Sequence, residues 1–329
     1  MSMRMKNHKP IILAQIKQTQ QGFTLVELLL VILVLSSLAL ATTFLVDGIG
    51  NQSRFDETKT RLQQIRQAII GDTSRTLNGQ PELRGYVADM GRLPVDLTEL
   101  IEMGTGSDEQ PAWGLSAVTA SDLSPVVTIS LNAGWRGPYL DTLPDSDGER
   151  RFRDGWGNGD LSSVNYGWSF GVDISGVSGV TVQSYGADGL SGVTTPGAVF
   201  EEDYPATGNL IEPNDYVVSL ANLNVQLDQP IAIAPSEDLV LRLYRISDGV
   251  IEDPAIESAA VTAVVGQQTL SFSVTEGLPH YMGNYAAVLI CDNLVVYDGN
   301  CVAPHMNSQP YYFTLIPRAQ LPIIPWNIQ

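Results

Sequence analysis

Glu27 is the first residue whose type and position call for a chemical explanation. It is the only charged residue between positions 23 and 46, a run of otherwise uncharged and mostly apolar residues. A carboxylate at the centre of an apolar helix costs about 2.5–3.5 kcal/mol on membrane-insertion scales. A cost of this size predicts that Glu27 has a cationic partner.

The junction in front of this run has a specific pattern, Gln-Gly-Phe-Thr-Leu-Val-Glu at positions 21–27. It resembles the class III leader of type IV prepilins and of type II secretion pseudopilins. The resemblance implies that a prepilin peptidase cuts after Gly22 and that the amine of Phe23, the new N-terminus, is methylated. Glu27 then becomes the fifth residue of the mature chain.

Cleavage at this junction would supply the missing cation. The ammonium of Phe23 and the carboxylate of Glu27 stand at i and i+4 of one helix, at a terminus that already favours an anion. Between neighbouring subunits, the same pair would set the axial stagger of a filament. The alternative is an uncleaved signal anchor in which Glu27 is hydrated near the membrane interface.

The element that must position these residues is a long helix. Residues 23–46 would measure roughly 36 Å as a helix, which is enough to span a bilayer. Four basic residues in the first 22 favour a cytoplasmic N-terminus with the rest of the chain exported; these are Arg4, Lys6, Lys9 and Lys17. The sequence therefore predicts a single-pass protein of the bacterial inner membrane, with its bulk in the periplasm or on a cell-surface filament.

The same helix is predicted to continue to about residue 71. Phe55, Leu62, Ile65 and Ile69 recur at spacings typical of one helix face. No proline interrupts positions 23–70. This second half is amphipathic, so it is expected to pack against a folded head.

Four motifs then resemble, in their order, the head of the major-pseudopilin-like family. They are Gly-Trp-Arg-Gly-Pro-Tyr-Leu at 134–140, Leu-Pro at 143–144, Asp-Gly-Trp-Gly-Asn at 154–158 and Ser-Tyr-Gly-Ala-Asp-Gly at 184–189. The resemblance implies a small antiparallel sheet, with strands expected near 164–171 and 180–185. A short helix is predicted around 97–103, with Asp96 or Thr98 as its cap.

Heads of this family often hold Ca²⁺ in the loop after the tyrosine-glycine turn, so the resemblance implies a possible structural calcium site. Calcium takes six to eight oxygen ligands. Asp188 matches the first carboxylate, and the later acidic group is Glu201, Glu202 and Asp203. The alternative is a turn aspartate beside a solvated acidic patch.

The last third of the sequence predicts an added β domain. Strand-like runs rich in Val, Leu, Thr and Tyr lie at about 216–227, 238–246, 258–265, 268–275, 285–291, 294–298 and 310–316. Their number and spacing fit a β-sandwich of immunoglobulin-like size, without resemblance to a particular family. The two cysteines, Cys291 and Cys301, are predicted to form a disulfide in an oxidising compartment, with two free thiols as the alternative.

The composition excludes several functions. With 36 acidic against 18 basic residues and a net charge of −18, the chain repels phosphate backbones, so no nucleic-acid binding is expected. Beyond Gly22 the only lysine is Lys59, so a P-loop is excluded. His280 and His305 lack metal-ligand spacing and are expected in surface loops. No motif predicts an enzyme.

The sequence thus predicts an α+β chain with four parts: a cleaved basic leader (1–22), a long helix (23–75, with 23–46 transmembrane), a pseudopilin-like head (76–203) and a β-sandwich-like domain (204–329). The predicted function is a structural subunit of a type II secretion or type IV pilus-like filament. Expected partners are other pilin or pseudopilin subunits, the prepilin peptidase and the inner-membrane assembly platform. The alternative function is a membrane-anchored adhesin or sugar-binding protein, and an unknown protein or glycan is a possible ligand of 204–329.

Overall fold

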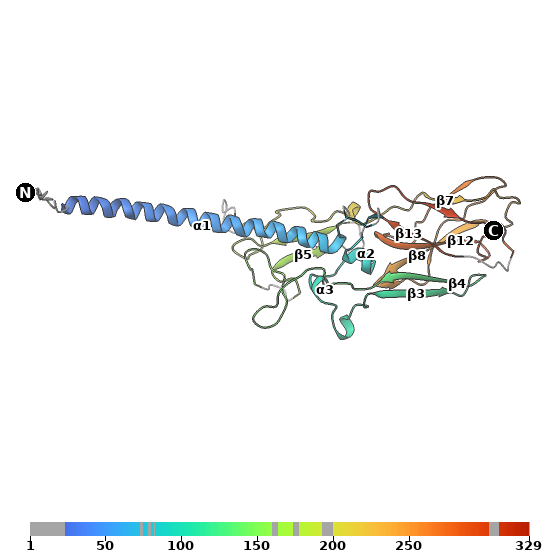
Figure 1. Ribbon diagram of the computed structural model, residues 1–329, viewed down its shortest axis with the longest axis horizontal. Helices are drawn as coiled ribbons and strands as arrows, with labels where there is room; N and C mark the ends of the chain where they lie inside the picture. The colour runs from blue at the N-terminus through green and yellow to red at the C-terminus, as the bar shows by residue number, and fades with distance from the viewer. Residues whose placement is uncertain are drawn as a thin grey trace, which may run out of the picture. The chain divides into compact units, whose positions relative to one another are not determined.

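The computed structural model confirms the α+β class (Figure 1). It describes residues 24–72, 75–77, 80–81, 83–159, 164–173, 178–192, 200–302 and 309–328. The chain divides into two compact units, Met1–Gly50 and Asn51–Gln329. Gly22, Phe23 and His305 lie outside the described residues, so the predictions about them remain predictions.

Helix α1 runs from Leu25 to Ile70, close to the bounds predicted from the sequence. It ends at Gly71, whose φ of +75° favours glycine; a Cβ there would lie 2.6 Å from the backbone oxygen of Arg84. No helix in the described part of the chain is both long enough and apolar enough to cross a membrane. The predicted membrane span at 23–46 is therefore not confirmed.

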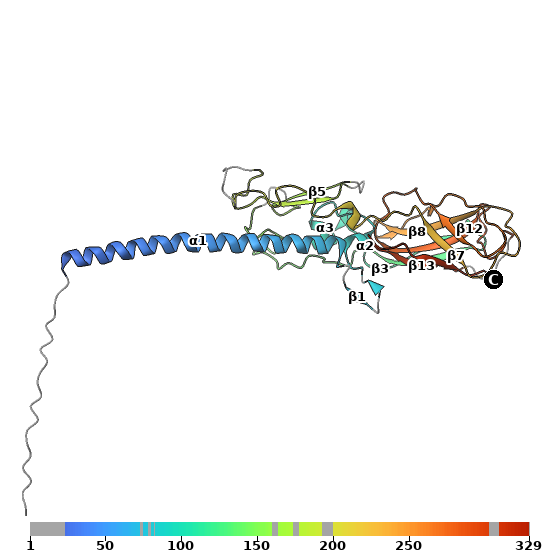
Figure 2. The same cartoon turned by 90° about the horizontal axis from the view of Figure 1, so that it is seen from above.

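Three of the four residues of the predicted apolar stripe of α1 lie in one hydrophobic core, while Phe55 packs against Phe200 and Tyr204. Leu62, Ile65 and Ile69 are buried, together with Tyr86 and Trp168 from the elements around them. Figures 1 and 2 show the C-terminal part of α1 among the short helices and the hairpin that contribute to this core. These elements are α2 (Tyr86–Met90), α3 (Thr98–Ile101), β5 (Trp168–Val172) and β6 (Val180–Ser184), with η1 (Gly106–Asp108), η2 (Pro213–Asp215) and the small pair β1 (Thr76–Leu77) and β2 (Gln80–Pro81) nearby in sequence.

The predicted elements of this region form, although shorter than expected. The helix expected at 97–103 is α3, and the backbone N–H of Glu99 donates to Asp96 Oδ1 at 3.3 Å, as expected of a cap. The strands expected near 164–171 and 180–185 are the antiparallel pair β5 and β6.

Most of the strands gather in a second core (Figure 2). A five-stranded antiparallel sheet has the order β10-β8-β12-β13, with β9 also paired to β8; a three-stranded sheet has the order β11-β7-β14, with β14 parallel to β7. The bounds are β7 (Leu223–Leu227), β8 (Leu239–Ser247), β9 (Val250–Ile251), β10 (Ile256–Glu257), β11 (Thr269–Phe272), β12 (Gly283–Cys291), β13 (Tyr311–Leu315) and β14 (Ile323–Trp326).

The hairpin of β3 (Gly114–Ala120) and β4 (Val127–Ala133) was not expected from the sequence. Its alternating residues Ile129 and Leu131 are buried in the same core as β8 and β12. The hydrophobic cores therefore do not follow the predicted boundary at residue 203. The hairpin precedes that boundary in sequence, yet it packs with the strands that come after it.

Two predicted strands, 258–265 and 294–298, do not form. Within them Val261 and Val296 make only isolated bridges, to Leu239 and Ile290. Leu294 has a φ of +66°, which is incompatible with an extended strand. These two predictions were wrong because apolar, β-branched composition does not by itself provide a neighbouring strand with a free edge.

The two cysteines and His280 also have definite places in the fold. Cys291, the last residue of β12, is joined to Cys301 by a disulfide with a Cα–Cα distance of 5.8 Å. His280 is fully buried, so the prediction that it lies in a surface loop was wrong. Its main-chain oxygen accepts from the backbone N–H of Val218 at 2.8 Å, and burial lowers the pKa of its imidazole.

Candidate functional site

The start of α1 is a capped helix terminus. Thr24 precedes the helix, and its Oγ1 accepts a hydrogen bond from the backbone N–H of Glu27 at 3.3 Å. Glu27 is exposed in the first turn, where a negative charge complements the helix dipole. The spacing Thr-x-x-Glu is that of a capping box, so Glu27 also has a local role at the start of the helix.

The helix surface that follows is apolar on every side. Large apolar side chains between Leu25 and Leu40 are exposed in this single chain, with 43–74% of their surface accessible. An amphipathic helix would instead confine these residues to one face. No other segment that the structure describes covers this surface.

The Asp-Gly-Trp-Gly-Asn motif is organised around one buried carboxylate. Asp154 is 2% exposed and accepts hydrogen bonds from the backbone N–H groups of Trp156 and Asn158, each at 3.1 Å. Asn158 Nδ2 donates to it at 2.8 Å, and the hydroxyl of Ser184 also donates to it. Asp154 therefore connects this motif to the end of β6, where the Ser-Tyr-Gly motif begins.

The same motif is docked on α1 through a glycine. Gly155 donates its backbone N–H to Thr58 Oγ1 at 3.0 Å, and the Thr58 hydroxyl donates to the Arg54 carbonyl at 2.9 Å. A Cβ on Gly155 would lie 2.1 Å from that carbonyl oxygen. Only glycine permits this close approach of the turn to the helix.

The structure brings together the two segments of the expected calcium loop. Ala187 donates its backbone N–H to Phe200 at 2.7 Å, and a Cβ on Gly186 would lie 2.9 Å from the main-chain oxygens of Glu201 and Glu202. Asp203 Oδ2 accepts from the backbone of Gly192 at 2.9 Å. Its other oxygen, Oδ1, is buried without a hydrogen-bond partner in the described part of the chain.

The carboxylates of this loop do not by themselves form a ligand set. Among the residues that the structure describes, no three His, Cys, Asp or Glu side chains are grouped as metal ligands. Asp188 Oδ1 accepts from the backbone N–H of Leu190 at 3.0 Å, which is the pattern of an Asx turn. The proposed ligands Asp188, Glu201, Glu202 and Asp203 therefore remain a prediction.

The Gly-Trp-Arg-Gly-Pro-Tyr motif surrounds a second buried carboxylate, which the sequence had not singled out. Asp89 in α2 accepts from Arg136 Nη2 at 2.8 Å, from Arg136 Nε at 3.1 Å and from the Tyr139 hydroxyl at 3.0 Å. The Asp89 side chain is only 3% exposed. Burial raises the pKa of Asp89 to about 6, although Arg136 and Tyr139 act in the opposite direction.

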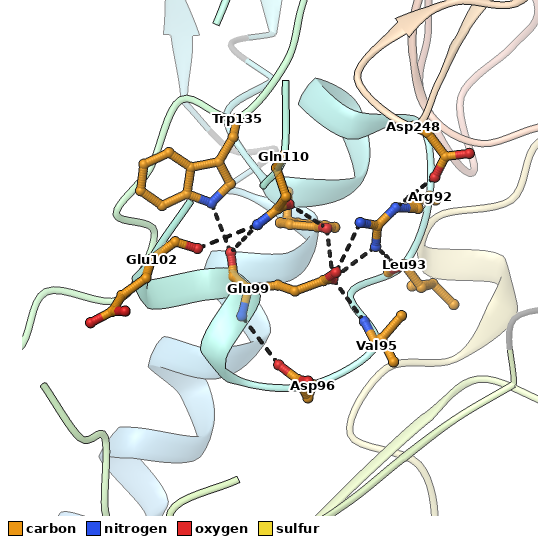
Figure 3. A network of polar contacts seen from close by, with 10 residues as sticks. Arg92, Leu93, Val95, Asp96, Glu99, Glu102, Gln110, Trp135 and Asp248 are labelled. Atoms are coloured by element: carbon orange, nitrogen blue, oxygen red, sulfur yellow. Dashed lines mark hydrogen bonds and ion pairs between the residues drawn. The ribbon is translucent and has the colours of Figure 1, made fainter. Parts of the chain in front are cut away.

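A third network connects the two cores (Figure 3). Glu99 accepts from Arg92 at 2.7 and 2.9 Å and lies 2.7 Å from the Tyr86 hydroxyl. Burial alone would raise the pKa of Glu99, but these hydrogen bonds hold that pKa below its usual value. Arg92 also pairs with Asp248 in the β8–β9 turn at 2.8 Å, while Trp135 donates to the Glu99 carbonyl at 2.7 Å.

The carboxylates of these networks share a structural role. Each carboxylate is engaged by arginine, tyrosine or backbone donors that fix one loop against another. In the acidic loop at 145–149, Arg151 pairs with Asp145 at 3.1 Å and with Asp147 at 2.7 Å. The head motifs therefore hold separate loops of the fold together.

The raised pKa of Asp89 predicts a pH dependence of stability. Between the ordinary pKa of 3.8 and about 6, the folded chain binds more protons at Asp89 than the unfolded chain does, so this contribution to the free energy of unfolding falls as the pH rises. Asp89→Asn removes it. The free energies of unfolding of the wild type and of Asp89→Asn should be measured in urea at pH 5 and at pH 7.5. The difference, wild type minus variant, should be larger at pH 5 by about 1.4 kcal/mol, which is the equivalent of one pKa unit. An advantage that stays constant, or that grows at pH 7.5, would contradict the raised pKa.

Comparison with known proteins adds one match. The family described as the prokaryotic N-terminal methylation motif matches residues 17–43. No curated protein and no solved structure matches the chain at a significant level. The matched segment contains Gly22, Phe23, Thr24 and Glu27, and it ends within α1. Residues 17–43 are the prepilin-type leader motif of type IV pilins and pseudopilins, while the C-terminal domain has no recognised family.

Proposed function

We propose that the chain is a pilin-like structural subunit, either a pseudopilin or a minor type IV pilin, that a prepilin peptidase processes. The observation that supports this most strongly is the leader motif at 17–43, which overlaps the first part of α1, where the helix surface is apolar on every side. A motif of this type points to a structural subunit and not to an enzyme.

The exposed apolar surface of α1 suggests how the subunit is stored and used. Contiguous apolar surface of this extent marks a membrane or protein contact. Before assembly, the lipid of the inner membrane would cover residues 25–40. After assembly, the same surface would pack against the α1 helices of neighbouring subunits, with an inner-membrane platform driving the exchange.

Processing is the first prediction of this proposal. In a host with a prepilin peptidase, the mature protein should begin at Phe23 and carry one extra methyl group, as shown by N-terminal sequencing and intact mass. Gly22→Val should leave the chain uncleaved, because a branched side chain replaces the glycine at the cut site, whereas Gln21→Ala should be processed normally. Wild-type protein that retains Met1 in this host would overturn the proposal.

Assembly is the second prediction, and Thr24 provides its control. Glu27→Gln should be cleaved but excluded from filaments, since it cannot neutralise the Phe23 amine of a neighbour. Thr24→Ala removes the cap at a cost of about 0.5–2 kcal/mol while keeping the charge, and it should still assemble. Filament incorporation is measured by shearing and immunoblotting. If Thr24→Ala is excluded as strongly as Glu27→Gln, helix capping and not charge pairing is the requirement.

We also propose that the loop from Asp188 to Asp203 binds Ca²⁺ as a structural ion. The buried, unpartnered Oδ1 of Asp203 supports this, because a buried carboxylate oxygen without a donor is costly unless a cation or hydrogen bond satisfies it. Main-chain oxygens such as those of Glu201 and Glu202 are the kind of further ligand that calcium accepts.

Calcium should therefore stabilise the chain. At a free concentration of 100 times its dissociation constant, Ca²⁺ should raise the free energy of unfolding by about 2.7 kcal/mol relative to chelator. Asp203→Asn should lose this increment, whereas Asp147→Asn, in the acidic loop paired with Arg151, should keep it. An increment of the same size in Asp203→Asn, or none in the wild type, would contradict the site.

A further inference from the structure

A small groove beside Tyr312 is lined by uncharged polar and aromatic side chains that have no role in the proposed filament. It has a volume of about 260 Å³ and is formed by β4, β12 and β13. Tyr312 is an exposed large side chain, with 47% of its surface accessible. The lining residues are Ser130, Leu131, Asn132, Asn284, Tyr285, Tyr312, Phe313 and Thr314.

The register of the strands explains why a groove forms here. Tyr244, Ala286 and Tyr312 lie directly opposite one another across β8, β12 and β13, so their side chains share one face of the sheet. The β3–β4 hairpin lies over this face, because the backbone N–H of Ser130 in β4 donates to the Tyr312 hydroxyl at 3.3 Å. Because β13 is the edge strand of the sheet, the hairpin does not fully cover it, and residues of β13 line an open groove.

The groove is uncharged in a strongly acidic protein. None of its eight lining residues carries a charge at neutral pH. A larger groove of about 710 Å³ lies beside α1 and differs in this respect, because half of its lining is charged. Several of those charges pair with one another, as in Arg61 with Glu57 at 2.6 Å and Arg151 with Asp145 at 3.1 Å.

The polar groups of the neutral groove suit a ligand rich in hydroxyls. Asn132 and Asn284 each offer two N–H donors and a carbonyl acceptor, and Ser130 and Thr314 offer hydroxyls. The Thr314 hydroxyl donates to Asn284 Oδ1 at 3.0 Å. This hydrogen bond fixes the orientation of the Asn284 amide and leaves its Nδ2 donors pointing away from Thr314. Tyr312 adds a partly exposed ring with an apolar face and a polar tip.

We propose that this groove binds a neutral saccharide, with one sugar ring stacked on Tyr312 and its hydroxyls bonded by Asn132, Asn284 and Thr314. A pyranose ring presents a C–H face to an aromatic ring and hydroxyls around its rim, and this matches the lining. The volume lies just below the range of about 300–1,000 Å³ for drug-sized ligands, so it suits one or two rings. A stable protein partner would need about 800 Å² of surface on each side, which is more than a groove of this size offers.

The binding site does not depend on processing or assembly, so it can be tested on the full chain held in a zwitterionic, sugar-free detergent. The probes are an array of neutral oligosaccharides and, in saturation-transfer NMR, free galactose, glucose, mannose, N-acetylglucosamine and the acidic sugar N-acetylneuraminic acid. We expect at least one neutral sugar to bind with millimolar affinity and the acidic sugar not to bind.

Substitutions test separately whether the Tyr312 ring and the polar residues around it contribute to sugar binding. Tyr312→Ala and Asn284→Ala should each weaken binding of that sugar at least tenfold, while Tyr312→Phe, which keeps the ring, should lose less. Thr119→Ala, on the exposed face of the same hairpin, should bind like the wild type. Unchanged melting temperatures establish that the variants are folded. Lack of binding to every neutral probe, binding of the acidic sugar alone, or full affinity in folded Tyr312→Ala would each overturn the proposal.

Discussion

The carboxylate of Asp154 is the interaction on which the arrangement of the helix-bound part of the molecule depends. A buried charge must be satisfied by several donors, and here they come from its own turn and from Ser184 at the end of β6. This fixes two loops against each other, and Gly155 then brings both against α1. The long helix is thereby tied to its head through polar groups at its surface as well as through the apolar stripe of Leu62, Ile65 and Ile69.

Helix α1 combines two surfaces with different physical requirements. Its second half is apolar along one stripe, and the folded unit that begins at Asn51 covers that stripe. Its first residues are apolar all round and stay exposed in a single chain. A surface of the second kind favours an apolar environment, and the methylation motif at 17–43 overlaps it.

The junction between the two cores is polar and closely packed. Arg92 bridges Glu99 and Asp248 (Figure 3). The backbone N–H of Gly249 donates to the main-chain oxygen of Met90 at 2.9 Å. A Cβ on Gly91 would lie 2.0 Å from the carbonyl oxygen of Ile246. These contacts connect α2 to β8 and to the β8–β9 turn, so the strands after residue 204 are an integral part of the folded unit.

The sequence alone determined the features that depend on local pattern. The junction at 21–27 and the long helix with its stripe follow from spacing and turn chemistry, which act over a few residues. The strands around Trp168 and Val182 were expected from the resemblance of the turn motifs to a pseudopilin head. It did not reveal Asp89, Glu99 or the β3–β4 hairpin, because their roles come from partners 7–182 residues away in sequence. His280 likewise reads as a loop residue in sequence and is buried in the fold. Only the tertiary structure decides such cases, because burial and ion pairing depend on which distant segments pack together.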